Sequence, residues 1–240
     1  MLLRRVSEHL RTQNWVAVGL DFLIVVAGVF LGIQLGNWNE GRIEARQERA
    51  LVMRLIEDAR QSAVSLDAAM EFTDEKAASA RWAHEIMLDG TLRPADEARF
   101  REEIASFGPW QGDRFVSATV DQAIADGSIA LIRSGAMRGL IAEHREDMEG
   151  RAISHQNLGS MNLQHLMALR DRLDIRITDE GQAVITPRSE MLADEDLRRT
   201  IGQFAFVYQE MAGLSRASIK MNADYREQLE AYARGRGWAE

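Results

Sequence analysis

The segment from Trp15 to Trp38 constrains this chain more than any other. It reads WVAVGLDFLIVVAGVFLGIQLGNW and contains one acid and no base. As an α-helix, roughly 24 residues rise about 36 Å, enough to cross a hydrocarbon core of about 30 Å. A tryptophan stands at each end, where amphipathic rings favour the headgroup level of a bilayer. The sequence therefore predicts a transmembrane helix over residues 15–38.

Residues 1–14 are short and basic, with Arg4, Arg5 and Arg11. We interpret them as a cytoplasmic or interfacial segment. The competing interpretation is a cleaved signal peptide, but the apolar run is longer than a signal h-region and no small-residue cleavage site follows it. Arginines also follow the span closely, so the positive-inside count is nearly balanced, and the free amino terminus favours an inner N-terminus. We expect a single-pass bacterial inner-membrane protein whose residues 39–240 form a periplasmic domain.

One face of the predicted span is built from small residues. Gly28, Gly32 and Gly36 repeat at four-residue spacing, which lets another helix backbone approach closely. At about 100° per residue, Ala17 and Asp21 fall on the same face. These five residues predict a helix-packing interface with a second copy or another membrane protein. The alternatives are that Asp21 reaches the headgroups at the membrane boundary and that the glycines pack against nothing.

Composition excludes several functional classes. The chain has 240 residues, a formal net charge of -8 and no cysteine. A nucleic-acid groove needs clustered Lys and Arg, whereas bases here are interleaved with more numerous acids. Disulfides, thiolate metal sites and a cysteine nucleophile are excluded by composition. The length leaves room for the anchor and one domain of ordinary size.

The region after the span is dominated by apolar residues at the alternating four-three spacing of helical seams. We predict long helices from Gly41 to about Leu88, from Ala136 to about Leu173, and from a cap at Asp194 or Asp196 onward. The predicted seam residues are Val52, Ile56, Ala59, Ala63, Leu66, Met70, Thr73, Ala77 and Ala80; Met137, Ile141, His144, Met148, Ala152, His155, Leu163, Leu166 and Leu173; and Leu197, Ile201, Phe204, Tyr208, Met211, Ser215, Ser218, Asn222, Tyr225, Leu229 and Tyr232.

Shorter elements fill the intervals between these helices. Residues 94–107 and 117–126 read as short helices, the second ending at Gly127 in a left-handed cap. Apolar residues flank Asp-Glu-Gly in residues 175–185, which indicates a small β-hairpin. The fold class predicted is all-α: an N-terminal transmembrane helix followed by an elongated antiparallel helical bundle with one small β-hairpin.

The opening of the chain resembles a family of bacterial membrane-anchored proteins of unknown function. The likeness is carried by QNW at 13–15, DF at 21–22, IVVAGVF at 24–30, GIQ at 32–34 and NWN at 37–39. A weaker likeness covers residues 119–137, with ADG at 125–127 and LIR at 131–133. The resemblance implies one span and a helical extracytoplasmic domain. It implies no activity and no site residue.

A search for chemistry returns no motif. None of the five histidines has an acid three residues before it, and no His-x-x-x-His pair occurs, so the metal sites typical of helical bundles are not predicted. Nucleotide, nucleophile-elbow and kinase signatures are also missing from the sequence. We therefore predict no catalytic residue, no cofactor, no metal and no enzymatic activity.

Two sets of polar or aromatic residues remain as candidates for function. His84, His144 and His155 lie on or beside the seams, where a core-edge histidine bonded to a carbonyl or hydroxyl is the main interpretation and a pH sensor the alternative. Ser215, Ser218 and Asn222 form a polar layer in the last seam that selects helix register or meets those histidines. The loop aromatics Phe107, Trp110 and Phe115 either cap the end of the bundle or form a recognition patch.

These observations favour a membrane-anchored helical protein that acts by protein association, as a scaffold or an accessory subunit. The runner-up is a sensor domain that binds a small ligand between its helices. A cavity with convergent polar groups would favour the sensor, whereas a packed bundle with an exposed apolar stripe would favour association. Expected partners are the lipid bilayer and a second copy or another membrane protein, with no nucleic acid.

Overall fold

The computed structural model describes residues 15–179 and 181–238, so the basic segment 1–14 lies outside the described residues. Its elements in chain order are α2 (Trp15–Asp89), α3 (Glu97–Ala105), α4 (Ala118–Ala125), the 3₁₀ helix η1 (Ser128–Leu131), α5 (Gly135–Arg170), β1 (Ile175–Thr178), β2 (Gly181–Val184), α6 (Arg188–Ala193) and α7 (Glu195–Gly235). The predicted helical fold with one hairpin is confirmed. The chain divides into two compact units, residues 1–50 and 51–240.

The first unit holds the apolar part of α2. This stretch is long and apolar enough to cross a membrane. Its large apolar side chains, from Leu20 to Trp38, are all exposed. A fully apolar helix surface is stable in a bilayer but costly in water, so the structure agrees with a membrane span here. α2 continues without a break to Asp89, where Gly90 adopts a φ of 62° and ends the helix close to the predicted end at Leu88.

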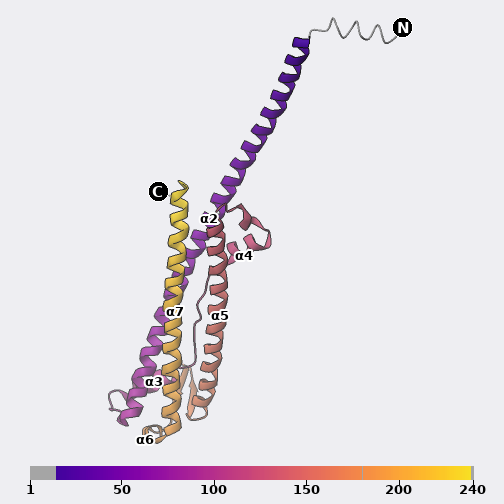
Figure 1. Cartoon of the computed structure of the whole chain (residues 1–240). Coiled ribbons are helices and arrows are strands. Elements are labelled where there is room, and N and C mark those ends of the chain that lie inside the picture. The colour runs from indigo at the N-terminus through magenta and orange to yellow at the C-terminus, as the bar shows by residue number, and fades with distance from the viewer. Residues whose placement is uncertain (1–14, 180, 239–240) are drawn as a thin grey trace, which may run out of the picture. The chain divides into compact units, whose positions relative to one another are not determined.

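The second unit is a bundle of three long helices, residues 51–89 of α2 together with α5 and α7 (Figure 1). Contacts between α2 and α7 show that they are antiparallel. Asn222 Nδ2 donates to the Ala59 carbonyl at 2.8 Å, and Arg216 lies 3.2 Å from Asp74, so the numbers rise along one helix as they fall along the other.

Helix α5 is also antiparallel to α7. The His144 ring stacks on Tyr225 with centroids 3.7 Å apart, and His165 lies against Phe204 with centroids 6.0 Å apart. α2 and α5 therefore run in the same direction. The connection between them must return along the length of the bundle, and this return segment shapes the interior.

The buried apolar residues form two clusters. The aromatic cluster is centred on Phe100, Phe107, Phe204 and Tyr208, all at most 1% exposed. The aliphatic cluster is centred on Leu51, Leu55, Ile141 and Leu229, with α4 packed against it. Each fully buried side chain of this size contributes about 1.5–3 kcal/mol through burial, so the clusters supply most of the drive for packing.

Between the two clusters, and extending into the aliphatic cluster at His144, lies a set of buried polar side chains, here called the polar layer. Its members are Ser62, Asp113, His144, His155, Ser215, Ser218 and Asn222.

The seam of α7 matches its sequence prediction at almost every position. Leu197 through Leu229 of the predicted set are all buried, and only Tyr232 is half-buried. Asp194 caps the helix, its Oδ1 accepting from the backbone N–H groups of Asp196 and Leu197 at 2.9 Å each. Both the seam and the first of the two predicted caps are confirmed.

The predicted seam of α5 is wrong at two positions in its second half, although His155 is buried there as expected. Ala152 and Leu163 were expected inside but are exposed, Leu163 by 58%. Gly159 and Asn162 occupy the buried positions instead. α5 is continuous through both Gly150 and Gly159, so neither glycine interrupts it. The face changes because this half of α5 packs against the return segment, which needs a small residue and a hydrogen-bond donor rather than apolar side chains.

The short elements agree with their predictions within a few residues. β1 pairs antiparallel with β2, with Ile175 opposite Val184, and Gly181 takes the positive φ of 128° at the turn. Gly127 adopts a φ of 75° after α4, and the Ser134 side chain caps α5 by accepting from the Met137 N–H.

Candidate functional site

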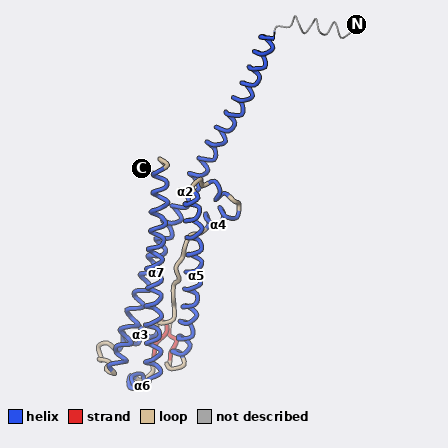
Figure 2. The backbone as a smooth tube through the Cα atoms, in the orientation of Figure 1, coloured by secondary structure: helices blue, strands red, loops and turns tan. Residues whose placement is uncertain are grey.

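The most unusual part of the bundle is the non-helical segment 106–117, which connects α3 to α4 and runs lengthwise beside α5 and α7 (Figure 2). Backbone N–H and C=O groups of such a segment have no helical partners, so a buried position requires bonds from neighbouring side chains. The polar residues in the helix seams supply these bonds.

At the aromatic cluster, two side chains bind the beginning of this segment. Asn162 Nδ2 donates to the Gly108 carbonyl at 2.7 Å, and the Gly108 N–H donates to the Tyr208 hydroxyl at 3.0 Å. The Tyr208 hydroxyl in turn donates to the Pro109 carbonyl at 3.2 Å. Asn162 is therefore buried in α5 because it pairs with backbone, which an apolar-periodicity argument does not detect.

In the polar layer, the segment contributes a buried carboxylate. Asp113 has a fully buried side chain, accepts from Ser215 Oγ at 2.7 Å, and lies 2.9 Å from His155 Nε2. Burial by itself raises the pKa of Asp113, but the imidazole and hydroxyl groups of His155, Ser218 and Ser215 lower it by more. The net result is a pKa below the usual value for this carboxyl.

The sequence predicted that Ser215, Ser218 and Asn222 could meet the histidines, and the structure shows that Ser215 and His155 meet through Asp113. The expected partner of a seam histidine was a carbonyl or hydroxyl, which is wrong for His155, since its Nε2 faces a carboxylate. Asp113 was missed because it lies in a loop with no periodic pattern. The sequence hint to a role for Asp113 was its position as an acid among the glycines and aromatic residues of this loop.

Further along, the segment is attached to α2. The Val116 N–H donates to Ser62 Oγ at 2.9 Å, and the Thr119 N–H at the start of α4 donates to Asp58 Oδ2 at 3.1 Å. Together with the contacts to α5 and α7, these bonds connect the return segment to all three long helices. The polar layer thus holds a non-helical segment inside a helical bundle.

A close approach explains the buried glycine of α5. The Trp110 indole lies over Gly159, where an added Cβ would come within 2.4 Å of two ring atoms. Any larger residue at this position would displace the indole. Trp110 itself is 40% exposed, so one side of the ring covers α5 and the other faces outward.

The three aromatics proposed for recognition have different surroundings. Phe107 is completely buried, its ring centroid 5.2 Å from that of Phe204, so it belongs to the core. Phe115 is half-buried and meets His144 edge-on. Only Trp110 presents a large exposed surface, so the prediction of a recognition patch in this loop now depends mainly on that side chain.

The predicted glycine face of the span remains uncovered by the described part of the chain. No heavy atom lies within 4 Å of a Cβ built at Gly28, Gly32 or Gly36, and Asp21 is exposed. Ala17 belongs to α2, but its side chain lies outside the described residues. The packing role of these residues stays a prediction.

A second uncovered surface lies on α5. Residues 152–169 contain no Asp, Glu, Lys or Arg, in a chain with 28% charged residues. Five exposed side chains there follow a four-three spacing, which is the pattern of a coiled-coil seam. We call this surface the outer seam; it consists of Ile153, Gln156, Ser160, Leu163 and Met167. Ile153, Leu163 and Met167 are 59%, 58% and 63% exposed.

The arrangement of the polar layer does not match a nucleophilic triad. In such a triad a histidine lies between the acid and the hydroxyl and removes the hydroxyl proton. Here the Asp113 carboxylate lies between His155 and Ser215, so the imidazole is not placed to activate that serine. Within residues 15–179 and 181–238, no group of three or more His, Asp or Glu side chains is placed to hold a metal ion.

Comparison with protein-family models, curated proteins and solved structures finds no match. The likeness of residues 13–39 to a family of bacterial membrane-anchored proteins therefore stays a prediction.

Proposed function

We propose that this protein is a membrane-anchored helical protein that acts by association with a second copy of itself. α2 supplies the anchor, and the outer seam of α5 supplies the contact surface. The glycine face of the span, which consists of Ala17, Asp21, Gly28, Gly32 and Gly36, is the second contact. In this proposal the protein serves as a scaffold or an accessory subunit.

The observation that carries this proposal is the outer seam itself. Exposed apolar residues at coiled-coil spacing are unfavourable in water and favourable against a matching helix. The chain carries a net charge of -8, so two copies repel each other over most of their surfaces. The uncharged face of α5 is where two acidic chains meet with the least repulsion, which favours a second copy as the partner.

Membrane anchoring supports the same geometry. Copies inserted in one bilayer share an orientation, so a two-fold axis that relates them lies along the membrane normal. In this proposal the two α5 helices meet in parallel across that axis. A parallel symmetric seam places each residue opposite its own counterpart. The span would pack in the same parallel manner through its glycines.

Because the chain has no cysteine, single-cysteine cross-linking tests this geometry cleanly. Under mild oxidation in isolated membranes, we expect Met167→Cys and Ser160→Cys to form disulfide-linked dimers. Glu227→Cys, exposed on α7, is the matched control and should remain monomeric. Equal cross-linking at all three positions would indicate random collision and would contradict the proposal.

The two contacts are separable by mutation. Leu163→Glu places a charge in the outer seam of each copy and should abolish the Met167→Cys cross-link. Gly32→Ile should weaken association of the isolated span in a bilayer reporter assay while leaving the fold of the bundle unchanged. An unchanged signal for Gly32→Ile would remove the glycine face from the proposal but retain the outer seam.

We also propose that the N-terminus is cytoplasmic and that residues 39–240 lie in the periplasm of a bacterial cell. The support is the basic segment before the span together with the net acidity of the bundle. An alkaline phosphatase fused after residue 240 should be active. Activity only from a cytoplasmic reporter at the same position would reverse this orientation.

A further inference from the structure

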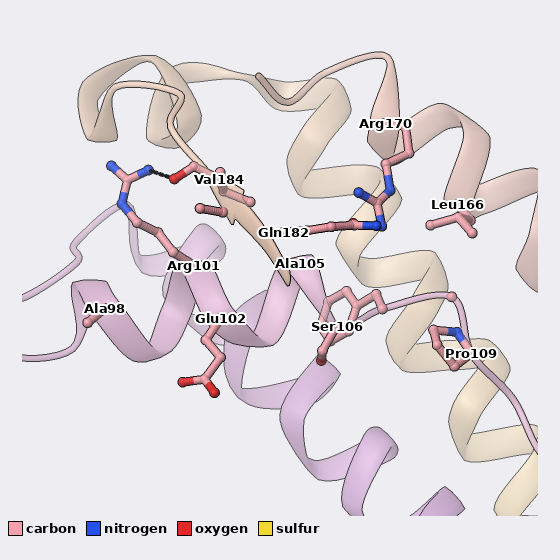
Figure 3. A pocket seen from close by; sticks show the side chains of 13 residues that line it. Ala98, Arg101, Glu102, Ala105, Ser106, Pro109, Leu166, Arg170, Gln182 and Val184 are labelled. Carbon is pink, nitrogen blue, oxygen red and sulfur yellow. Dashed lines mark hydrogen bonds between the residues drawn. The ribbon is translucent and has the colours of Figure 1, made fainter. Parts of the chain in front are cut away.

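An open cleft of about 780 Å³ lies at the end of the bundle that contains the hairpin. It is formed by α3, the start of the return segment, the last turns of α5 and strand β2 (Figure 3). Cavities of this size accommodate small organic ligands. The cleft shares no residue with the outer seam, so ligand binding here is independent of association between copies.

The walls of the cleft are held in place by hydrogen bonds among themselves. Arg101 of α3 donates to the carbonyls of Val184 and Thr186 at 3.0 and 2.8 Å, and to Glu97 Oε1 at 2.8 Å. This arginine is therefore occupied in fixing the hairpin against α3. Opposite, Gly108 has a φ of +115°, and a Cβ there would lie 2.7 Å from the Leu166 side chain, so the loop is pressed against α5.

A second arginine in the cleft has no such structural task. Arg170, the last residue of α5, is half-buried, and among the described residues it forms no ion pair and no hydrogen bond. Its charge is favourable near the carbonyl end of the helix, but that interaction leaves the guanidinium donors free. In Figure 3 the Gln182 side chain extends in the direction of Arg170, which adds amide donors on the same side of the cleft.

The remaining lining determines which anions fit. Leu166, Ala105 and Pro109 offer apolar surface, with the nearly buried Val184 beside them. Glu102 contributes a carboxylate at the edge, and in Figure 3 it points away from Arg170. A single guanidinium with an acid nearby disfavours a multiply charged phosphate, whereas a monoanion with an apolar body meets both the arginine and the apolar wall.

We propose that this cleft binds a small monocarboxylate with an apolar body. The carboxylate accepts two parallel hydrogen bonds from the Arg170 guanidinium and one from the Gln182 amide, and the apolar body lies against Leu166 and Val184. Binding there bridges α5 and the hairpin.

The test uses 4-phenylbutyrate as the probe, titrated calorimetrically into the full chain in lipid nanodiscs, with empty nanodiscs as the blank. We expect saturable binding that is about 10- to 100-fold weaker for Arg170→Gln, because a hydrogen-bonded charge of this kind contributes on that scale. Arg170→Lys keeps the charge but loses the planar fork, so it should be intermediate.

Arg81→Gln is the matched control, since it removes one exposed positive charge of α2 that lies outside the cleft. It should leave binding unchanged. The neutral analogue 4-phenylbutyramide, titrated into the unaltered chain, should bind at least 10-fold more weakly, because it lacks the charge that Arg170 pairs with. This readout is independent of any variant's folding. Equal binding of acid and amide, equal binding by Arg170→Gln, or no binding above the blank would overturn the proposal.

Discussion

The aromatic cluster and the polar layer occupy adjacent parts of the same bundle, yet they hold the chain together in different ways. Phe100, Phe107 and Phe204 are buried among other apolar groups, where stability depends on area and packing. The Asp113 and His155 side chains are equally buried, but the carboxylate is stable there because Ser215 Oγ donates to it at 2.7 Å and His155 Nε2 lies 2.9 Å away. The first region tolerates changes of pH, and the second depends on protonation.

The difference arises from the return segment 106–117. Where it begins, Phe107 anchors it in the aromatic cluster by burial. Further along, at position 113, the buried side chain is a carboxylate rather than an apolar group, and a hydrogen bond holds it instead. A non-helical segment inside a helical bundle thus needs both kinds of interaction: apolar burial where it begins and hydrogen bonds further along. Three substitutions test this distinction.

The largest effect is expected in the aromatic cluster. Phe204→Ala removes a fully buried ring that packs against Phe107 and Tyr208, and should lower the free energy of unfolding by about 4 kcal/mol. Phe206→Ala, two residues later but 58% exposed, is the control and should change it by less than about 0.5 kcal/mol. Urea unfolding of the solubilised full chain, followed by circular dichroism, measures both. Similar losses for the two variants would contradict the core assignment.

The next effect is a pH dependence that originates in the polar layer. Burial lowers the pKa of His144 to about 4, although the nearby Asp147 carboxylate acts in the opposite direction. Because the unfolded chain has the higher pKa, of 6.5, it takes up the proton first. Stability from neutral His144 is therefore complete above about pH 6.5 and is lost as the pH falls towards 4, by up to about 3 kcal/mol.

His144→Phe isolates this contribution. The phenyl ring keeps the stack on Tyr225, whose centroid lies 3.7 Å away, but it does not titrate. We expect the unfolding free energy of the variant to vary less between pH 6.5 and 4 than that of the unaltered chain. Parallel pH profiles for the two proteins would show that His144 does not carry the dependence.

The smallest of the three effects concerns the contact between the return segment and α5. Gly159→Ala would force the Trp110 indole away from the helix and should cost about 2 kcal/mol. Gly150→Ala in the same helix meets nothing within 4 Å and should instead raise stability by about 0.5–1 kcal/mol. Thermal unfolding of both variants gives the comparison, and a stabilising Gly159→Ala would show that Trp110 does not need this position.

The contrast between α7 and α5 shows how far sequence reasoning extends. Every α7 residue predicted for the seam from Leu197 to Leu229 is buried, because that helix packs mainly through residues whose hydrophobicity marks them as core; the prediction omitted Thr200, Val207 and Ala212, which are buried as well. In α5 the pattern failed at Ala152 and Leu163. Gly159 is buried instead to admit an indole, and Asn162 to bind a carbonyl. Neither function leaves a hydrophobic signal.

The cleft and the outer seam were inaccessible to sequence reasoning for a related reason. Leu163 reads as a core residue until the face of α5 that meets α7 is known. Arg101 and Arg170 are indistinguishable in sequence, and only their distant partners, or the lack of them in the described structure, separate a structural arginine from a free one. Phe107 shows the opposite error. The sequence offered it as part of an exposed recognition patch, and the structure places it in the core.

By itself, the sequence determined the apolar span at Trp15–Trp38, the long helices, their caps and the hairpin turn, because these depend on periodicity and local backbone preference over short distances. The tertiary structure alone decided the path of residues 106–117, the pairing of Asp113 with His155 and the exposure of the outer seam. The physical reason is that a buried backbone or carboxylate must find its hydrogen-bond partners wherever the fold brings them. Here those partners are distant in the chain, 54 residues away for Ser62 and Val116 and 102 residues away for Ser215 and Asp113.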